Sequence, residues 1–330
     1  MSYTSVELCA GAGGAAVGLE QAHFKHVALV EIDKHACQTL RLNRPKWNVI
    51  QADLQLFSGK PFKGAALVSA GVPCPPFSKA GKQLGKEDER DLFPAALRIV
   101  SEVKPKAVML ENVRGLLDPI FKDYRDDIQA QLSKMGYISE WKLFNASDFG
   151  TSQLRPRVVL VALKKDYWNF FEWPKPNKKT APTVGELLFS EMSKNGWLGA
   201  TAWKKIANDI APTIVGGSKK HGGPDLGPTR SKRAWEKLGV DGMGIANEPP
   251  AKDHVGLPRL TVKMAALLQG FPKDWQFFGA KTPAYRQVGN AFPPHVARAV
   301  GESIMTALEI GDSLLMEKTK TSTKQLEFTV

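Results

Sequence analysis

Short apolar runs alternate with amphipathic helical patterns along the first half of the chain. Runs typical of buried strands occur at residues 5–8, 27–30, 48–53, 65–70 and 105–110. Helical spacing of apolar residues covers 91–103 and 123–135, and two further strands are predicted at 138–145 and 153–162. This alternation predicts an α/β fold with a Rossmann-like sheet and helices on both of its faces.

The last part of the chain carries helical patterns again. A helix is predicted at 261–269, and a second one at 294–310 has an apolar stripe. The stripe consists of Val296, Ala299, Val300, Ile304 and Leu308. Because such a stripe is usually core, we expect this helix to close the sheet, and we expect the polar tail from Lys318 onward to be frayed.

The character of the sequence changes between residues 175 and 257. A linker-like run, 174–179, leads into a segment rich in Gly, Pro, Lys and Arg with little periodicity. Two basic stretches dominate it, residues 211–224 and 229–233. The segment predicts a smaller, irregular domain inserted into the α/β fold. The alternative is a solvated loop, although long irregular loops are usually functional or disordered.

Composition and charge narrow the class of protein. The chain has 330 residues, 43% hydrophobic, and a formal net charge of +12, which favours a polyanionic partner such as nucleic acid. Its three cysteines, Cys9, Cys37 and Cys74, are odd in number and lack metal spacing. We therefore expect a cytoplasmic protein without a bound metal. No run is long and apolar enough for a membrane span, so no membrane partner is expected.

A glycine-rich turn follows the first predicted strand. Residues 10–14, Ala-Gly-Ala-Gly-Gly, lead into a helix, where glycines allow close approach of a ligand to backbone N–H groups. Acids end the next two strands, Glu31 and Asp53, where ribose hydroxyls are bound in such folds. Acids would repel a pyrophosphate, so the pattern favours S-adenosylmethionine over NAD.

Three further segments carry candidate chemistry. Cys74 stands between Pro73 and Pro75 after a predicted strand, so its thiol is placed on a stiff loop at a strand end. Glu111 ends another strand, and Gln153, Arg155 and Arg157 alternate along an extended segment. Each has a structural alternative: a small buried cysteine, a capping acid, and arginines paired with local acids.

Together these segments resemble the C5-cytosine DNA methyltransferase family. The matching motifs occur in the family's order: Pro73-Cys74, Glu111-Asn112-Val113, Gln153-x-Arg155-x-Arg157, residues 267–272 and residues 286–290. Two positions differ, since the family usually has Phe where Cys9 stands and Gln where Pro75 stands. The first difference bears on cofactor affinity, because the family's ring packs on the adenine.

The resemblance implies roles for the catalytic residues. Cys74 would add to carbon 6 of a cytosine flipped out of the duplex, Glu111 would act at N3, and Arg157, supported by Arg155, would hold O2. The product of the cofactor would be S-adenosylhomocysteine. The implied cofactor-binding residues are Cys9, Ala10, Gly11, Ala12, Gly13, Gly14, Glu31, Ile32, Asp53, Leu54, Pro73, Leu92 and Asn290.

The resemblance also assigns the parts of the chain. We expect a catalytic and cofactor-binding domain at 1–177, a target-recognition domain at 178–257, a return to the catalytic domain at 258–310 and a tail at 311–330. Double-stranded DNA is the expected substrate, with contacts from Ser78, Lys219, Lys220, Arg230, Lys232 and Arg233. Cationic readers favour guanine, and the segment looks like regions that recognise GC-rich palindromes with a CCGG core.

Two other functions remain open on the sequence. An RNA cytosine methyltransferase of the same fold would share Cys74 and Glu111, although the long basic insert favours duplex DNA. A DNA-binding regulator with an inactive site is opposed by the intact Cys74, Glu111 and Arg157. A cognate restriction endonuclease is a candidate partner, and a monomer is expected.

Overall fold

The centre of the molecule is a mixed seven-stranded sheet. A computed structural model describes residues 2–73, 91–177, 181–216 and 224–327. The strands are β1 (Thr4–Leu8), β2 (Lys25–Glu31), β3 (Val49–Gln51), β4 (Leu67–Gly71), β5 (Ala107–Val113), β6 (Tyr137–Asn145) and β7 (Pro156–Lys164). Their order is β3-β2-β1-β4-β5-β7-β6, with the first five parallel and β7 antiparallel to both of its neighbours. The predicted fold class is confirmed.

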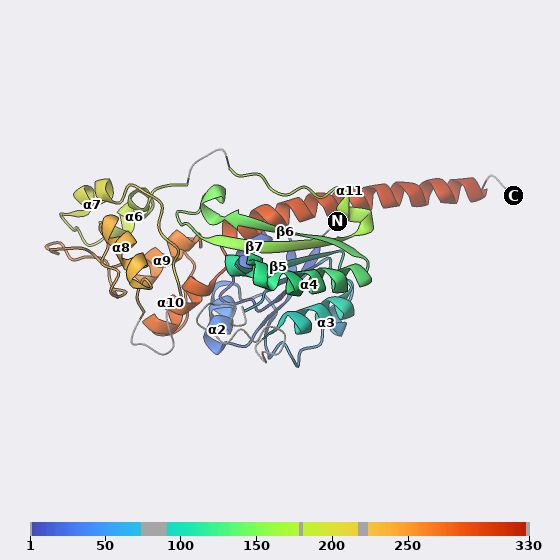
Figure 1. The fold of residues 1–330 in the computed structure, drawn as a ribbon, viewed down its shortest axis with the longest axis horizontal. Helices are drawn as coiled ribbons and strands as arrows, with labels where there is room; N and C mark the ends of the chain where they lie inside the picture. The colour runs from blue at the N-terminus through green and yellow to red at the C-terminus, as the bar shows by residue number, and fades with distance from the viewer. Residues whose placement is uncertain (1, 74–90, 178–180, 217–223, 328–330) are drawn as a thin grey trace.

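Both faces of the sheet are covered because apolar side chains point alternately up and down along the central strands. On β5, Val108 and Leu110 pack with helices α3 (Phe93–Val103) and α4 (Lys122–Lys134). Ala107 and Met109 face the other side, with helices α1 (Gly14–Gln21), α5 (Lys165–Trp168) and α11 (Pro294–Glu327). Figure 1 shows α3 and α4 together below the sheet.

Helix α11 is longer than its sequence pattern predicts. The predicted end at Ile310 and the frayed tail are wrong in this respect, because the helix continues to Glu327 and projects beyond the sheet (Figure 1). Its first turns pack along α1, with Val300, Ile304 and Leu308 buried. Ile310, Leu314 and Met316 are exposed, so the apolar stripe is core only along the first half of the helix.

The inserted region is more helical than expected. It contains α6 (Val184–Met192), α7 (Ala200–Ile206) and α8 (Thr229–Lys237), which lie together at one end of the molecule in Figure 1. These helices share a core with α9 (Val262–Gln269) and α10 (Lys281–Asn290). Trp203 and Trp235 are at its centre, 3% and 0% exposed, so the region is a packed unit and not a solvated loop.

Helices α2 (Lys34–Asn43) and α10 were not evident from the pattern either. Helix α2 begins at Asp33, whose carboxylate caps the Ala36 N–H, and α10 carries the Arg286–Asn290 motif. Among the residues described, no helix is long and apolar enough to cross a membrane.

Candidate active site

A cavity of about 1030 Å³ opens at the carboxyl ends of the central parallel strands. This is where open α/β sheets bind ligands. Its lining comes from the ends of β1, β2, β4 and β5, from the glycine turn before α1, and from α10 with the turn that follows it. The cavity therefore joins the predicted cofactor residues to the predicted catalytic residues.

The glycine turn forms one wall of the cavity. Gly11 has a φ of +53°, and its N–H donates to a carboxylate oxygen of Glu31 at 2.7 Å. The other oxygen of Glu31 accepts the Asp33 N–H, also at 2.7 Å. At Gly14 a Cβ would lie 2.2 Å from the carbonyl oxygen of Phe292, so only glycine lets α1 start against that turn. Burial raises the pKa of Glu31, and the backbone donors oppose this shift.

The predicted cofactor residues gather around this cavity with one exception. Those that line it are Cys9, Ala10, Gly11, Ala12, Gly14, Glu31, Ile32, Asp53, Leu54, Pro73, Leu92 and Asn290. Gly13 does not line it and instead caps α1 beneath Leu40 and Trp275, with a φ of +92°. Cys9 adopts a left-handed φ of 52°, and burial raises the pKa of its thiol to about 12.

The two candidate catalytic groups at the far end of the cavity form an ion pair. Arg157 Nε lies 2.8 Å from Glu111 Oε1, and both side chains are largely buried, at 12% and 13% exposure. The pair spans adjacent antiparallel strands, with Glu111 on β5 and Arg157 at the start of β7. Burial raises the pKa of Glu111, while the Arg157 cation acts in the opposite direction. Such a carboxyl is suited to sharing a proton with a bound base.

Asn112 connects this pair to the segment that precedes Cys74. Its side-chain amide donates to the Val72 carbonyl at 3.1 Å, and Pro73 lines the cavity directly after it. Cys74 itself, Ser78, Lys219 and Lys220 lie outside the described residues. The chain therefore enters the predicted nucleophile loop from the wall that also carries Glu111.

Arg155 occupies a different position from Arg157. It is 1% exposed, does not line the cavity, and donates to the carbonyls of Ile214, Gly289 and Ala291 at 2.6 to 2.9 Å. These carbonyls belong to the inserted region and to the end of α10 with its following turn. Arg155 therefore acts through the backbone it holds, and the geometry gives it a positioning role.

The described DNA-binding candidates lie on one helix. Arg230, Lys232 and Arg233 are in α8 and not in an irregular loop as expected from composition. Arg230 and Arg233 are exposed, whereas Lys232 pairs with Asp225 at 2.7 Å. Arg230 and Arg233 are therefore the better placed of the three to reach a ligand.

Comparison with known proteins identifies the family. Residues 3–306 match the C-5 cytosine-specific DNA methylases. The chain belongs to this family. Over 312 residues it is 59% identical to the Type II methyltransferase M.NgoMIV of Neisseria gonorrhoeae, covering 94% of this chain and 99% of that protein. Type II methyltransferase M.NaeI of Lentzea aerocolonigenes is 54% identical over 316 residues, covering 94% and 76%.

Solved structures agree with the fold. The Entamoeba histolytica methyltransferase EhMeth superposes with a TM-score of 0.66 at 16% identity, over 93% of this chain and 99% of that one. With the family and its Type II relatives, the protein is a DNA (cytosine-5-)-methyltransferase of the restriction-modification type.

Several residues that line the larger cavity were not predicted to act there. They are Glu7, Asn112 and Arg286, and only Asn112 and Arg286 stand within the motifs shared with the family. Glu7 is on β1, where its alternation with Val6 and Leu8 resembles that of any strand. In the described part of the chain, no cluster of His, Cys, Asp and Glu could hold a metal.

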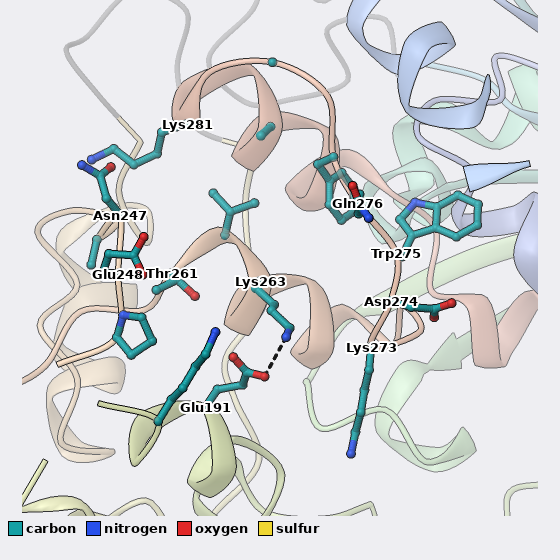
Figure 2. A pocket seen from close by; sticks show the side chains of 17 residues that line it. Glu191, Asn247, Glu248, Thr261, Lys263, Lys273, Asp274, Trp275, Gln276 and Lys281 are labelled. Atoms are coloured by element: carbon teal, nitrogen blue, oxygen red, sulfur yellow. Dashed lines mark ion pairs between the residues drawn. The ribbon is translucent and has the colours of Figure 1, made fainter. Parts of the chain in front are cut away.

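A second cavity, of about 580 Å³, is separate from this site. It lies between α6, α9 and the loop before α10, and Figure 2 shows Lys263 paired with Glu191 across it at 2.8 Å. None of its lining residues lines the larger cavity, and none is a predicted site residue. Of these two cavities, only the larger is lined by predicted site residues.

Proposed function

We propose that this methylase transfers a methyl group from S-adenosylmethionine to carbon 5 of a cytosine flipped out of double-stranded DNA, through a covalent Cys74 adduct. The observation that carries the proposal is the single cavity that runs from the Gly11–Glu31 contact to the Glu111–Arg157 pair and ends at Pro73. A cofactor and a base bound in one cavity can meet without water between them.

The residues present fit S-adenosylmethionine. Glu31 is fixed by two backbone N–H groups, which leaves further lone pairs of its oxygens to accept ribose hydroxyls. Ile32, 64% exposed, offers apolar surface beside it for the adenine, and Asn290 also lines the cavity. When bound, the cofactor supplies an electrophilic methyl group.

The chain's own groups account for activation of the base. A thiol has a pKa of about 8.5 and reacts as its thiolate, which a nearby cation such as Arg157 stabilises. Attack of the Cys74 thiolate on carbon 6 forms an S–C bond and moves electrons toward N3, which takes a proton from Glu111. Arg157 holds O2 of the ring.

The remaining steps restore the enzyme. After carbon 5 has gained the methyl group, a water or a nearby group takes the carbon 5 proton, the C–H electrons form the C5=C6 bond, and the S–C6 bond breaks so that Cys74 leaves as a thiolate, while the N3 proton returns to Glu111. None of these steps can occur while the target base is stacked in the duplex. The base must therefore leave the helix, at a cost of roughly a few kcal/mol.

The recognition sequence is proposed to be a GC-rich palindrome with a CCGG core. The match to M.NgoMIV supports a shared target, because it covers 94% of the chain and therefore most of the inserted region. The proposal also includes a cognate restriction endonuclease as a partner. The protein is proposed to be monomeric and cytoplasmic. The family match favours DNA over RNA as the substrate.

Bisulfite sequencing of DNA from cells that express the protein tests reaction and site together. We expect new 5-methylcytosine at one palindromic site with the wild type and none with Cys74→Ala, which should still bind DNA specifically because phosphate and base contacts lie elsewhere. Turnover of Cys74→Ala within tenfold of wild type would contradict the mechanism.

A trapping experiment examines the adduct directly. Fluorine at carbon 5 cannot leave as a proton, so DNA with 5-fluorocytosine at the site should stay bound to wild-type protein through Cys74. Mass spectrometry of the peptide identifies the residue, and Cys37→Ala is a control because Cys37 is buried at 0% exposure. An active enzyme without the adduct would exclude attack at carbon 6.

A further inference from the structure

Glu7 is a buried carboxyl in the cavity wall with an unused oxygen. It is 2% exposed and lines the larger cavity near the glycine turn. Within the described part of the chain, its Oε2 atom has no hydrogen-bond partner. Ser69, its register neighbour on β4, is 1% exposed and its hydroxyl also has no partner there. A buried, unsatisfied polar group of this kind needs an explanation.

The surroundings of Glu7 oppose its ionisation. The backbone N–H of Ala16 in the first turn of α1 favours the charged form, but burial and the nearby Glu31 carboxylate from β2 oppose it. The Cys9 thiol also interacts with Glu7 and carries no positive charge. Together, burial and Glu31 raise the pKa of Glu7 to about 8.

We propose that cofactor binding releases a proton from Glu7, which is protonated in the free protein and becomes ionised when a cationic group of S-adenosylmethionine lies in the cavity. The inference rests on the proposed use of that cofactor. A cation within a few ångströms favours the charged form of a carboxyl, and Glu7 has an oxygen free to meet it. The cofactor has two cations, its sulfonium and its α-ammonium.

The proton balance of this step is simple. The carboxyl O–H bond of Glu7 breaks, the proton passes to buffer, and the carboxylate keeps the electron pair and faces the bound cation. Because Glu7 is mostly protonated at pH 7 when its pKa is about 8, binding should release up to about 0.9 proton per cofactor at pH 7 and almost none at pH 9.5.

Titration calorimetry in phosphate and in Tris, which differ in ionisation enthalpy, measures this number. We expect the release in wild type at pH 7, its loss in Glu7→Gln, and its persistence in Ser69→Ala, a matched change of the buried neighbour. Infrared difference spectra should lose a protonated-carboxyl band on binding in wild type and not in Glu7→Gln.

S-adenosylhomocysteine separates the two cations. If the sulfonium is the partner, only S-adenosylmethionine releases the proton; if the ammonium is the partner, both molecules do. Release below about 0.1 proton in wild type, or equal release in a folded Glu7→Gln, would overturn the inference. Failure of S-adenosylmethionine to bind wild type at all would instead overturn the proposed cofactor.

Discussion

Cys9 is the residue at which this cavity differs from the family pattern. It lines the cavity, and burial raises the pKa of its thiol to about 12, so it is a weak nucleophile at neutral pH. With the proposed cofactor bound, an adenine at this point would meet a small side chain and the exposed Ile32.

Cys9→Phe should tighten binding of S-adenosylmethionine. A ring over the adenine adds dispersion and stacking of about 0.5 to 1.5 kcal/mol, or roughly a two- to twelvefold lower dissociation constant. Calorimetry measures the change, with Cys37→Ala as the control away from the cavity. Weaker binding would mean that Ile32 already occupies the space of the ring.

Glu7→Gln should make the protein more stable at alkaline pH. The folded pKa of about 8 lies above the ordinary value of 4.5, so the folded state holds the proton more tightly than the unfolded state does. Wild-type stability therefore falls as pH rises from about 4.5 to 8, by an amount on the order of a few kcal/mol. In urea unfolding, the free energy of unfolding of Glu7→Gln should rise relative to that of wild type between pH 5 and pH 8.5. Curves that stay parallel over this range would contradict the raised pKa of Glu7.

Site residues at the ends of strands can be predicted from the sequence, whereas site residues within strands cannot. Glu31, Glu111 and Asp53 follow apolar runs, so the carboxyl edge of the sheet brings them together. Glu7 alternates with Val6 and Leu8 in the same pattern that a half-buried strand would show. Arg155 and Arg157 alternate identically, and only packing determines that one lines the cavity and the other holds backbone carbonyls.

Among the secondary-structure elements, buried strands are the most predictable and polar helices the least. The run at 105–110 corresponds to β5, and the helical pattern at 91–103 to α3. Helix α8 is missed because its basic residues dominate the composition and only Trp235 of the helix is fully buried. Helix α11 continues past Ile310 through Gly311, a residue type that often ends helices. Packing explains this glycine, because a Cβ there would lie 2.4 Å from the ring of Tyr167 on α5.

Asp312 ties α11 to the sheet and to α5. Its carboxylate accepts from Tyr3 and Tyr167 hydroxyls and from the Lys106 ammonium at 2.6 to 2.8 Å, and it is 7% exposed. The Asp312 carboxylate thus joins four parts of the chain: the N-terminal segment, the residue before β5, α5 and α11. These donors hold the pKa of Asp312 below its ordinary value despite burial.

Asp312→Ala should cost about 2 to 4 kcal/mol of unfolding free energy, because it leaves two buried hydroxyls and an ammonium without their acceptor. Glu309→Ala, at an exposed position one turn earlier, is the control and should change little. Since the folded pKa is depressed, the difference should be full near neutral pH and should shrink as pH falls through it. A constant difference from pH 7 to pH 2 would argue against the ionised contact.

At the scale of the molecule, hydrogen bonds hold the wall of the larger cavity and the inserted region together. Arg155 links the Ile214 carbonyl to those of Gly289 and Ala291, and Gln153 accepts the Ile214 N–H at 2.8 Å. A Cβ on Gly289 would lie 2.4 Å from the Gly216 Cα, so the two segments touch through glycines. The segment of the inserted region that ends at Gly216 is therefore fixed against the end of α10 beside Asn290.

That placement makes α8 the element on which sequence reading should be tested. Arg230 and Arg233 are three residues apart on one helix and are exposed, which suits a helix that lies against DNA. If either reads guanine, its change to Ala should cost about 1 to 3 kcal/mol at the preferred site and relax selectivity there. If it contacts phosphate only, affinity should fall uniformly and the salt slope should decrease by about one unit.

Methylation of a randomised-site library, with binding measured at several salt concentrations, separates these results. Lys237→Ala, at an exposed position on the same helix, is the matched control for removing one positive charge from α8. We expect at least one of the two arginine variants to relax selectivity where the control does not, because arginine bidentate to guanine is the commonest specific contact. If both arginine variants keep the methylation profile and the DNA affinity of wild type, recognition lies in other parts of the inserted region and not on α8.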